Sequence, residues 1–446
     1  MNYQEALTYL YSIAPPFHEV GAKAYKPGLE TMRRLMAALS GQQSAVSHQL
    51  SVLDCPVVHV AGTNGKGSTS HLIAAALAAA GKRVGLYTSP HLVSFCERVR
   101  VVEAAIKPRM IPEEYVAEFV GRNQGLFEQL QPSFFEITTA MAFCWLSEQK
   151  VDVAVIEVGL GGLLDATNIV DPCLTVITNI GYDHTDLLGH TLAEIAGQKA
   201  GIMKRGIPCV IGESNEETKP VFLSKAEECG ILGDGLETTG CKIWLADECE
   251  FLRRQRLRVA PECELKGDYQ QKNMQTAFVA LKALGNQMSE IRDQNIAEGF
   301  ANVVRYTGLR GRWEVLSLAP KVICDTGHNS HGIATYVEQL RGLCAEHTVH
   351  IVFGIVADKD VDAVLRLLPE EATYYFTQPN SHRAMAAEEL LGKWKAIRPD
   401  SKAKAYKTVS EALTSAHAAA TQEEVIFIGG SNYVVGEAIR EEELRS

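Results

Sequence analysis

The amino-terminal part of the chain contains the segment Val57-Val58-His59-Val60-Ala61-Gly62-Thr63-Asn64-Gly65-Lys66-Gly67-Ser68-Thr69. The apolar run from Val57 to Val60 predicts a buried strand, and the Ala- and Leu-rich run from Ser68 to Ala80, closed by Gly81, predicts a helix. The backbone N–H groups of the turn between them and the dipole of the helix favour phosphate oxygens. This strand, turn and helix therefore predict a phosphate-binding loop.

The turn is a shortened variant of the common G-x-x-x-x-G-K-[ST] pattern. Only Thr63 and Asn64 separate the two glycines before the lysine, and Gly67 stands between Lys66 and Ser68. In this interpretation Lys66 neutralises the charge of the β- and γ-phosphates. The alternative is a glycine-rich turn that merely links a strand to a helix.

Further apolar, β-branched runs follow the loop and are separated by helical patterns, as a parallel sheet covered on both faces requires. A polar, irregular region at 213–264 and a helical stretch at 270–284 complete this part. We therefore expect an α/β domain whose further strands are Val84–Thr88, Val153–Val158, Leu174–Ile180 and Cys209–Ile211.

The alternation of strands and helices restarts at Lys321. The pattern predicts a P-loop-type parallel-sheet ATP-binding domain at 1–306, a linker at 307–318 and a smaller Rossmann-like α/β domain at 319–446. The segments expected in the second domain are strands Val322–Asp325, His350–Gly354, Tyr374–Thr377 and Val425–Ile428, and helices near Ile333–Leu343 and Val361–Leu368.

Composition and charge indicate which kinds of ligand and partner the protein can bind. The 446 residues are 46% apolar and 22% charged, which is typical of a folded globular protein, and the net charge of −11 offers no basic field for nucleic acid. Eleven cysteines occur without a C-x-x-C pair, Met1–Ala14 lacks the pattern of a secretory signal, and the longest apolar stretch is well short of the roughly 20 residues that cross a bilayer. We expect a cytoplasmic protein that binds a small phosphorylated ligand, without nucleic acid or membrane as a partner.

Candidate metal ligands follow the expected strands of the first domain. Glu157 ends an apolar run and is followed by glycines, His184 comes after the next strand, and Lys199 lies on the helix beyond it. Each has an ordinary alternative: an acid that caps a strand, a structural histidine, or a solvated lysine. Together with a phosphate loop they indicate Mg²⁺ bridging ATP phosphates, although an ammonium beside Mg²⁺ is repelled unless it pairs with phosphate or becomes an anion.

Two charged residues stand out near the start of the second domain. Arg312 lies in the expected linker, where a permanently charged bidentate donor suits a γ-phosphate, although it could instead be a salt-bridged hinge arginine. Asp325 closes the first strand of the domain and precedes a polar turn, where it could also serve only as a helix N-cap.

Taken together, these motifs resemble the folylpolyglutamate synthase family of the Mur ligase superfamily. The resemblance covers nearly the whole chain, in order and spacing. It is carried by Gly62–Ser68, Thr88-Ser89-Pro90-His91-Leu92, Ser133-Phe134-Phe135-Glu136, Leu164-Asp165-Ala166-Thr167-Asn168, Asp183-His184-Thr185, Tyr269-Gln270-Gln271-Lys272-Asn273, Asp325-Thr326-Gly327-His328-Asn329 and Asp358-Lys359-Asp360.

The resemblance implies an ATP-dependent ligase that joins L-glutamate to folate or dihydropteroate through an acyl phosphate, acting as a monomer. It implies two Mg²⁺ sites and a carbamylated Lys199, which turns the cationic side chain into an anion. The implied metal ligands are Ser89, Glu157, His184 and Lys199, and the implied catalytic residues are Lys66, Lys199, Asp325 and His328. The implied ATP contacts are Gly62, Thr63, Asn64, Gly65, Lys66, Gly67, Ser68, Asn273, Arg312 and Asp325, and the implied substrate pocket is Pro27, Gly28, Leu29, Ser133, Phe134, Phe135, Glu136, Leu164, Asp165 and Ala166.

Two positions near the expected pterin site depart from the family pattern, because Leu163 and Thr31 stand where the family usually has arginine. They leave the ATP chemistry intact and bear on which acid is used. The competing hypotheses are a Mur-type ligase for another acid, such as a UDP-muramoyl acid, and a non-catalytic P-loop nucleotide switch. The folate-like segment from Ser133 to Glu136 argues against the first, and a second domain bearing Asp325 and His328 argues against the second.

Overall fold

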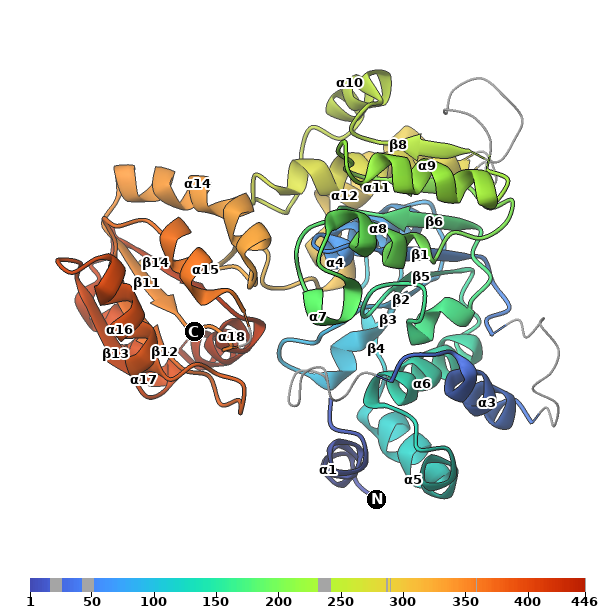
Figure 1. Cartoon of the computed structure of the whole chain (residues 1–446), viewed down its shortest axis with the longest axis horizontal. Helices are drawn as coiled ribbons and strands as arrows, with labels where there is room; N and C mark the ends of the chain where they lie inside the picture. The colour runs from blue at the N-terminus through green and yellow to red at the C-terminus, as the bar shows by residue number, and fades with distance from the viewer. Residues whose placement is uncertain are drawn as a thin grey trace. The chain divides into compact units, whose positions relative to one another are not determined.

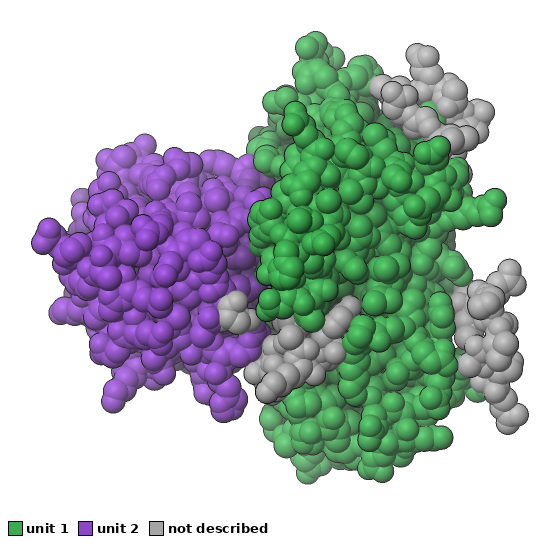
Figure 2. Space-filling model, in the orientation of Figure 1, with its two compact units in different colours: residues 1–91, 96–264, 271–309 green, residues 92–95, 265–270, 310–446 purple. Residues whose placement is uncertain are grey.

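The chain forms two compact units in a computed structural model that describes residues 1–16, 26–41, 52–231, 242–285, 288, 290–357 and 359–445. The first unit comprises residues 1–91, 96–264 and 271–309, and the second comprises 92–95, 265–270 and 310–446 (Figures 1 and 2). Most of the expected linker, residues 310–318, lies in the second unit. Among the described residues, no helix combines the length and the apolar character that crossing a lipid bilayer requires.

The first unit is built on an eight-stranded sheet with the order β4-β3-β2-β5-β1-β6-β7-β8. Neighbours from β2 to β8 run parallel, and β3 and β4 add an antiparallel edge. The strands are β1 (Val57–Ala61), β2 (Val84–Tyr87), β3 (Val99–Val102), β4 (Arg109–Met110), β5 (Val153–Glu157), β6 (Leu174–Ile177), β7 (Cys209–Ile211) and β8 (Ile243–Leu245).

The α4 helix (Lys66–Ala79) follows the phosphate loop and is buried from Ser68 to Ala78. It packs against β1, β2 and β5 on one side, while α12 (Asp293–Ala301) packs on the other. The approach of α12 is close, because a Cβ at Gly299 would lie 2.4 Å from the Ala76 Cα. An Ala- and Leu-rich helix without a polar face is therefore enclosed between a sheet and a second helix.

The other helices of this unit surround the sheet (Figure 1). The region at 213–264, which was predicted to be irregular, contains two helices and β8 among its described residues. This prediction was wrong because a three-residue strand and a charged helix give little apolar periodicity. The helices are α1 (Tyr3–Ile13), α3 (Glu30–Leu39), α5 (Glu113–Leu130), α6 (Phe134–Glu148), α7 (Thr185–Leu188), α8 (Leu192–Ala200), α9 (Lys219–Glu228), α10 (Glu250–Val259), α11 (Gln270–Gly285), α13 (Val303–Thr307) and the 3-10 turns η2 (Phe95–Arg98) and η3 (Ala166–Ile169).

The second unit holds a six-stranded sheet with the order β13-β12-β11-β14-β10-β9, parallel except for the antiparallel edge strand β9. Helices cover both faces: Ile323 joins a core with residues of α14, α15 and α16, while Val322 and Cys324 join one with α17 and α18. The elements are β9 (Glu314–Leu318), β10 (Lys321–Cys324), α14 (Ser330–Glu346), β11 (Val349–Phe353), α15 (Val361–Leu367), β12 (Thr373–Thr377), α16 (Ala387–Ile397), β13 (Ala403–Tyr406), α17 (Val409–Ala419), β14 (Val425–Gly429) and α18 (Asn432–Arg445).

The predicted α/β class is thus confirmed for both units. Because β2, β5, β1 and β6 are adjacent and parallel, the segments that follow these four strands lie at one edge of the first sheet. The register places Val60 of β1 opposite Glu157 and Ala61 opposite Ile177. The loop after β1, the acid that ends β5 and the segment after β6 are therefore neighbours.

Candidate functional site

The phosphate loop depends on two glycines whose positions exclude a side chain. Gly62 has φ 148°, and a Cβ there would lie 1.8 Å from the Thr178 Oγ1. Gly65 has φ 79°, and its Cβ would lie 2.2 Å from the Oδ1 of Asn273. Gly65 is also the N-cap of α4, and as a glycine it makes no side-chain cap hydrogen bond to the positive end of this helix. The loop has the geometry of an anion-binding helix start, and the Asn273 side chain lies against it.

The segment after β6 holds the loop in place. Thr178 donates its hydroxyl to the Asn64 carbonyl at 2.6 Å, and the Asn179 side-chain oxygen accepts the Asn64 N–H at 2.9 Å. Thr63 donates its N–H to the Asn179 carbonyl at 2.9 Å and accepts the Gly181 N–H at 3.0 Å. Thr178 and Asn179 were expected in a strand extending to Ile180. Instead, β6 ends at Ile177, since the next residues turn toward the loop.

Two lysines meet at the start of the loop. Lys66 donates from Nζ to the Gly62 and Thr63 carbonyls, each at 3.1 Å, and Lys199 donates to the Gly62 carbonyl at 2.9 Å. Lys199 is buried at the end of α8. Burial and, secondly, the charge of Lys66 lower the pKa of Lys199 to about 7, against the opposing pull of Asp183 and Asp165. Near neutral pH, a large fraction of this side chain is therefore an uncharged amine.

Three of the predicted metal ligands of the first unit lie at or after the ends of strands β2, β5 and β6, and the fourth, Lys199, lies on α8. Glu157 is buried at the end of β5, and one of its carboxylate oxygens accepts the Ser89 N–H at 3.1 Å. His184 adopts a left-handed backbone (φ 51°), with its Nε2 3.8 Å from the Asp183 carboxylate. Over the described residues, no three or more His, Cys, Asp or Glu side chains are grouped as a metal site. The structure therefore brings Ser89 and Glu157 together and pairs His184 with Asp183.

The predicted substrate segments converge in the first unit. Leu29 is the N-cap of α3, which follows Pro27 and Gly28, and α3 packs against both α6 and η3. The Phe135 ring lies on Gly159, where a Cβ would approach it to 2.4 Å, and stacks on Tyr87 at 6.0 Å between ring centroids. Phe134 is buried and Ala166 begins η3. The side chains that precede Ala166 in the loop after β5 are more open, since Leu163 is 43% exposed and Leu164 is 36% exposed. These segments form an aromatic and apolar environment beside the loop after β5.

Hydrogen bonds engage the polar members of this set. Ser133 and Glu136 form the capping box of α6, in which the Ser133 hydroxyl and N–H both donate to the Glu136 carboxylate. Asp165 is the N-cap of η3, and burial raises the pKa of its carboxyl against several hydrogen bonds that lower it. The cap roles explain why Ser133 and Glu136 stand at this spacing.

In the second unit, Asp325 joins three segments. Its carboxylate accepts the Tyr269 hydroxyl at 2.7 Å and the N–H groups of Trp313 and Gly327 at 2.9 and 2.8 Å. Burial raises the pKa of Asp325, opposed by the Tyr269 hydrogen bond and the charge of Arg312. Tyr269 was recognised in the sequence only as part of a motif. The residues next to it in the sequence do not indicate that its hydroxyl reaches Asp325.

The other predicted residues of the second unit lie in the same two turns. Arg312 donates to the Thr326 hydroxyl and to the Gly311 carbonyl, and the His328 Nδ1 lies 3.0 Å from the Thr326 carbonyl. The structure therefore brings Arg312, Asp325 and His328 together within this unit. Asp358, which belongs to one of the motifs quoted above, lies outside the described residues.

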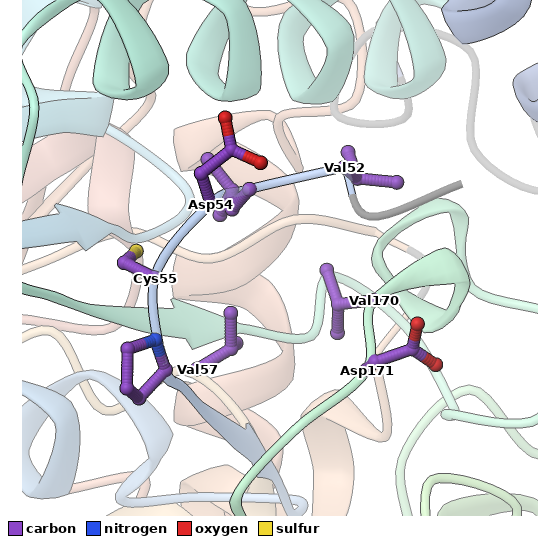
Figure 3. Close-up of a pocket in the computed structure, with 8 residues that line it drawn as sticks. Val52, Asp54, Cys55, Val57, Val170 and Asp171 are labelled. Carbon is purple, nitrogen blue, oxygen red and sulfur yellow. The ribbon is translucent and has the colours of Figure 1, made fainter. Parts of the chain in front are cut away.

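A separate pocket of about 370 Å³ lies at the opposite edge of the first sheet (Figure 3). Val57 begins β1 there, and Val170 and Asp171 precede β6. Its lining residues are Val52, Leu53, Asp54, Cys55, Pro56, Val57, Val170 and Asp171, and they include none of the predicted site residues. The pocket is therefore distinct from the phosphate-loop edge.

Comparison with known proteins places both units among ligases. Residues 60–281 match the Mur ligase middle domain, and residues 311–432 match the Mur ligase glutamate ligase domain. The chain is similar to the dihydrofolate synthase/folylpolyglutamate synthase of Bacillus subtilis, with 33% identity over 82% of this chain and 84% of the relative.

Solved structures show the same similarity over the full length. Escherichia coli FolC in complex with DHPP and ADP has a TM-score of 0.78 at 29% identity and covers 100% of this chain and 98% of that one. The bifunctional folylpolyglutamate synthase/dihydrofolate synthase of Yersinia pestis, with AMPPNP and Mn ion, has a TM-score of 0.77 at 27% identity and the same coverage.

Proposed function

Because this chain belongs to the folylpolyglutamate synthase and dihydrofolate synthase family of Mur ligases, we propose that it is an ATP-dependent ligase that joins L-glutamate to a folate-type acid. The reaction forms a C–N bond and releases ADP and phosphate. The observation that carries the proposal is the meeting of the Lys66 and Lys199 side chains at the Gly62 carbonyl, at the sheet edge where the buried Glu157 ends the neighbouring strand β5. This edge of the first sheet therefore gathers cationic and anionic groups that suit a nucleoside triphosphate and its metal.

ATP is assigned to the phosphate loop of the first unit. The amides from Gly62 to Ser68 hold phosphate oxygens, and Lys66 neutralises charge on the transferred phosphoryl group. Asn273, Arg312 and Asp325 contact the nucleotide, with His328 near the transferred phosphate. In this assignment Asp325 acts mainly by holding the Trp313 and Gly327 turns in position.

Two sites for divalent cations are assigned to the first unit. Their ligands would be Ser89, Glu157, His184 and a modified Lys199. The cations would neutralise phosphate charge during transfer. The relative with AMPPNP and Mn ion supports a divalent metal at such a nucleotide site. Glu157 supplies the one buried carboxylate of this set, so a second anion from Lys199 would complete it.

The modification proposed for Lys199 is a carbamate. The neutral amine attacks carbon dioxide, an N–C bond forms, and one proton leaves to solvent, which converts a potential cation into an anion. The lowered pKa supports this step because only the uncharged amine has the lone pair for attack. Burial beside the Gly62 carbonyl shields the product from hydrolysis.

The acid substrate is assigned to the segments at Pro27–Leu29, Ser133–Glu136 and Leu164–Ala166. Its carboxylate takes the γ-phosphoryl group of ATP to give an acyl phosphate and ADP; the amine of L-glutamate then attacks the acyl carbon, and phosphate leaves. For a folate the reacting group is the γ-carboxylate of the last glutamate, and for dihydropteroate it is the benzoate carboxylate. Leu163 and Thr31, in place of arginine, bear on this choice.

The test is release of ADP by the purified protein with MgATP, L-glutamate and either dihydropteroate or tetrahydrofolate. We expect ADP only when both the acid and glutamate are present, and mass spectrometry should detect the product one glutamyl residue heavier than the acid. A nucleotide switch would hydrolyse ATP without regard to the acid. Absence of ADP with either acid would refute the proposal.

We also propose that the enzyme acts as a monomer in the cytoplasm on small-molecule substrates. The ten cysteines among the described residues are free thiols, in keeping with a reducing compartment. The net charge of −11 argues against nucleic acid as a partner.

A further inference from the structure

We propose that His59 and Thr167 are positioning residues that fix the Asp165 carboxylate and, through it, the glycine-rich loop that follows Glu157. Neither residue belongs to the acid- or ATP-binding set described above. The inference rests on the proposed role of Asp165 in the acid pocket. It concerns how that carboxylate is oriented.

The three side chains form one buried chain of hydrogen bonds. His59 lies on β1 and is 0% exposed, with its Nε2 2.8 Å from the Thr167 Oγ1. The Thr167 hydroxyl is 2.5 Å from Asp165 Oδ1, which also accepts the Thr167 N–H at 3.0 Å. Both carboxylate oxygens accept backbone N–H groups, Oδ1 from Thr167 and Oδ2 from Leu160, and the Thr167 hydroxyl also donates to Oδ1. Because its single proton is used in this bond, the Thr167 hydroxyl must accept from His59.

The direction of the hydrogen bond from His59 to Thr167 determines the tautomer of the imidazole. His59 must carry its proton on Nε2, which leaves a lone pair on Nδ1. Consistent with that tautomer, no donor or acceptor among the described residues hydrogen-bonds to Nδ1. Burial lowers the pKa of His59 to about 3, so the ring is neutral near neutral pH. The imidazole is thus a fixed, uncharged donor.

An aliphatic residue would suit the apolar surroundings of His59 and would bury no nitrogen without a hydrogen-bond partner, as His59 does with Nδ1. Its neighbours on β1 are Val57, Val58, Val60 and Ala61, and all are buried. Burying an imidazole nitrogen without a partner is unfavourable. The donor bond to Thr167 is therefore the feature that distinguishes histidine from valine at this position.

The chain continues from Asp165 into the backbone of the loop. The second carboxylate oxygen, Oδ2, accepts the Leu160 N–H at 2.9 Å, and the Asp165 N–H donates to the Gly162 carbonyl at 3.2 Å. Both carboxylate oxygens are thus held by backbone donors. The rotation of the Asp165 side chain and the path of residues 160–165 are fixed together.

The same loop is attached to the end of α8 that carries Lys199. Leu163 donates its N–H to the Gln198 carbonyl at 2.8 Å, and a Cβ at Gly162 would lie 2.9 Å from the carbonyl oxygens of Gln198 and Lys199. Asn168 donates to the carbonyls of Leu163 and Gly201 at 3.0 and 3.1 Å. A change at His59 therefore reaches the acid pocket through hydrogen bonds alone.

The test compares variants that remove a donor with variants that keep one. Thr167→Val removes the hydroxyl at nearly constant shape, while Thr167→Ser keeps it; His59→Leu removes the imidazole donor, while His59→Gln keeps an N–H at similar reach. Thr175→Val, at a fully buried threonine of β6, controls for loss of a buried hydroxyl elsewhere in the sheet.

We expect Thr167→Val and His59→Leu to raise the KM for the acid about tenfold or more, with the KM for MgATP changed by less than about twofold. Thr167→Ser and His59→Gln should recover most of this loss. The double variant His59→Leu/Thr167→Val should lose no more than the worse single variant, because both break one chain. Equal effects on the two KM values, or additive effects, would overturn the inference.

A second readout does not depend on activity. Hydrogen exchange of the Leu160 amide should be faster in Thr167→Val than in wild type and Thr175→Val. If the Leu160 amide is protected equally in Thr167→Val and wild type, the hydrogen-bond chain is refuted, whether or not the protein is an active ligase. If the exchange changes as expected but wild-type protein has no ligase activity, only the proposed function is refuted. If Thr167→Val does not fold, Thr167→Ala is compared with Thr167→Ser by the same exchange measurement, with the same two outcomes.

Discussion

The Nζ atom of Lys199 lies 2.9 Å from the carbonyl oxygen of Gly62, so a buried lysine from α8 contacts the first residue of the phosphate loop. The contact joins segments 137 residues apart in the sequence. It places an amine whose pKa is lowered to about 7 where a triphosphate is expected to bind.

Replacement of Lys199 by alanine should abolish most of the ligase activity. The carbamate would supply an anionic oxygen to the metal, and its loss should lower kcat by about 100-fold or more. Activity measured with carbon dioxide removed, and with a short carboxylate added to the variant, separates the carbamate from the amine. Lys225→Ala, on the surface of the same unit, serves as the control. Full activity of Lys199→Ala without any carboxylate would contradict the carbamate.

Carbamate formation should increase with pH through about 7. Above this value Lys199 is mostly the neutral amine that attacks carbon dioxide, and below it the ammonium has no lone pair. With ¹³C-bicarbonate, a carbamate carbon signal should therefore appear in the NMR spectrum of the wild type as the pH rises from 6 to 8. The signal should be missing from Lys199→Ala at each pH.

Unmodified Lys199 should also make stability depend on pH. Its pKa is about 7 in the folded protein against a reference value of 10.5, so between these values the unfolded chain binds a proton that the folded protein does not. The free energy of unfolding then rises with pH, by about 1.4 kcal/mol per pH unit at most. Below pH 7 the cost of burying the charge is fully present.

Lys199→Met removes this dependence. In urea titrations without bicarbonate, we expect the variant to be more stable than wild type at pH 6, with the difference shrinking as pH rises through 7 toward 10. The difference between the two proteins cancels the titration of other groups. A difference that stays constant from pH 6 to 9 would show that Lys199 titrates normally.

Gly65→Ala should impair ATP binding. The new methyl group would lie 2.2 Å from the Asn273 Oδ1 and would force φ 79° on an alanine, which costs about 1–2 kcal/mol before the clash is relieved. We expect the Kd for ATP to rise by about tenfold or more in calorimetry, with the fold retained by circular dichroism. Gly125→Ala is the matched control, because Gly125 lies within α5 and, apart from its chain neighbours and the backbone of this helix, no atom lies within 4 Å of its Cβ position. The control should be neutral or more stable than wild type, by up to about 1 kcal/mol.

Asp325→Asn should destabilise the second unit and lower kcat. The carboxylate accepts three donors, whereas an amide has one oxygen and a nitrogen that cannot accept, so at least one donor loses its partner at a cost of about 1–3 kcal/mol. Tyr269→Phe removes one donor and leaves the carboxylate held by two N–H groups, so its loss should be smaller. Thermal unfolding and steady-state kinetics compare the two. Equal behaviour of Asp325→Asn and wild type would show that the carboxylate is not needed to hold the turns.

Much of the fold follows from the sequence by itself. Each unit repeats a strand of β-branched residues and a helix of period 3.6, which leaves a parallel sheet with helices on both faces as the physically reasonable outcome. The phosphate loop and Glu157 are local signals: two glycines beside a lysine, and an acid directly after four apolar residues. Short strands such as β8 and the charged helix α10 carry too little apolar periodicity to be recognised in this way.

The sequence predicted a phosphate loop after β1 and an acid at the end of β5, because these predictions depend on residue type and on position at a strand end. Tertiary structure alone decided which buried groups meet. Lys199 contacts Gly62 across 137 residues, His59 contacts Thr167 across 108, and Tyr269 contacts Asp325 across 56. The pairings depend on strand order, helix packing and the path of the turns, which set both distance and burial. Burial then determines that Lys199 is partly uncharged and His59 neutral, since desolvation acts on a side chain only through the atoms that surround it.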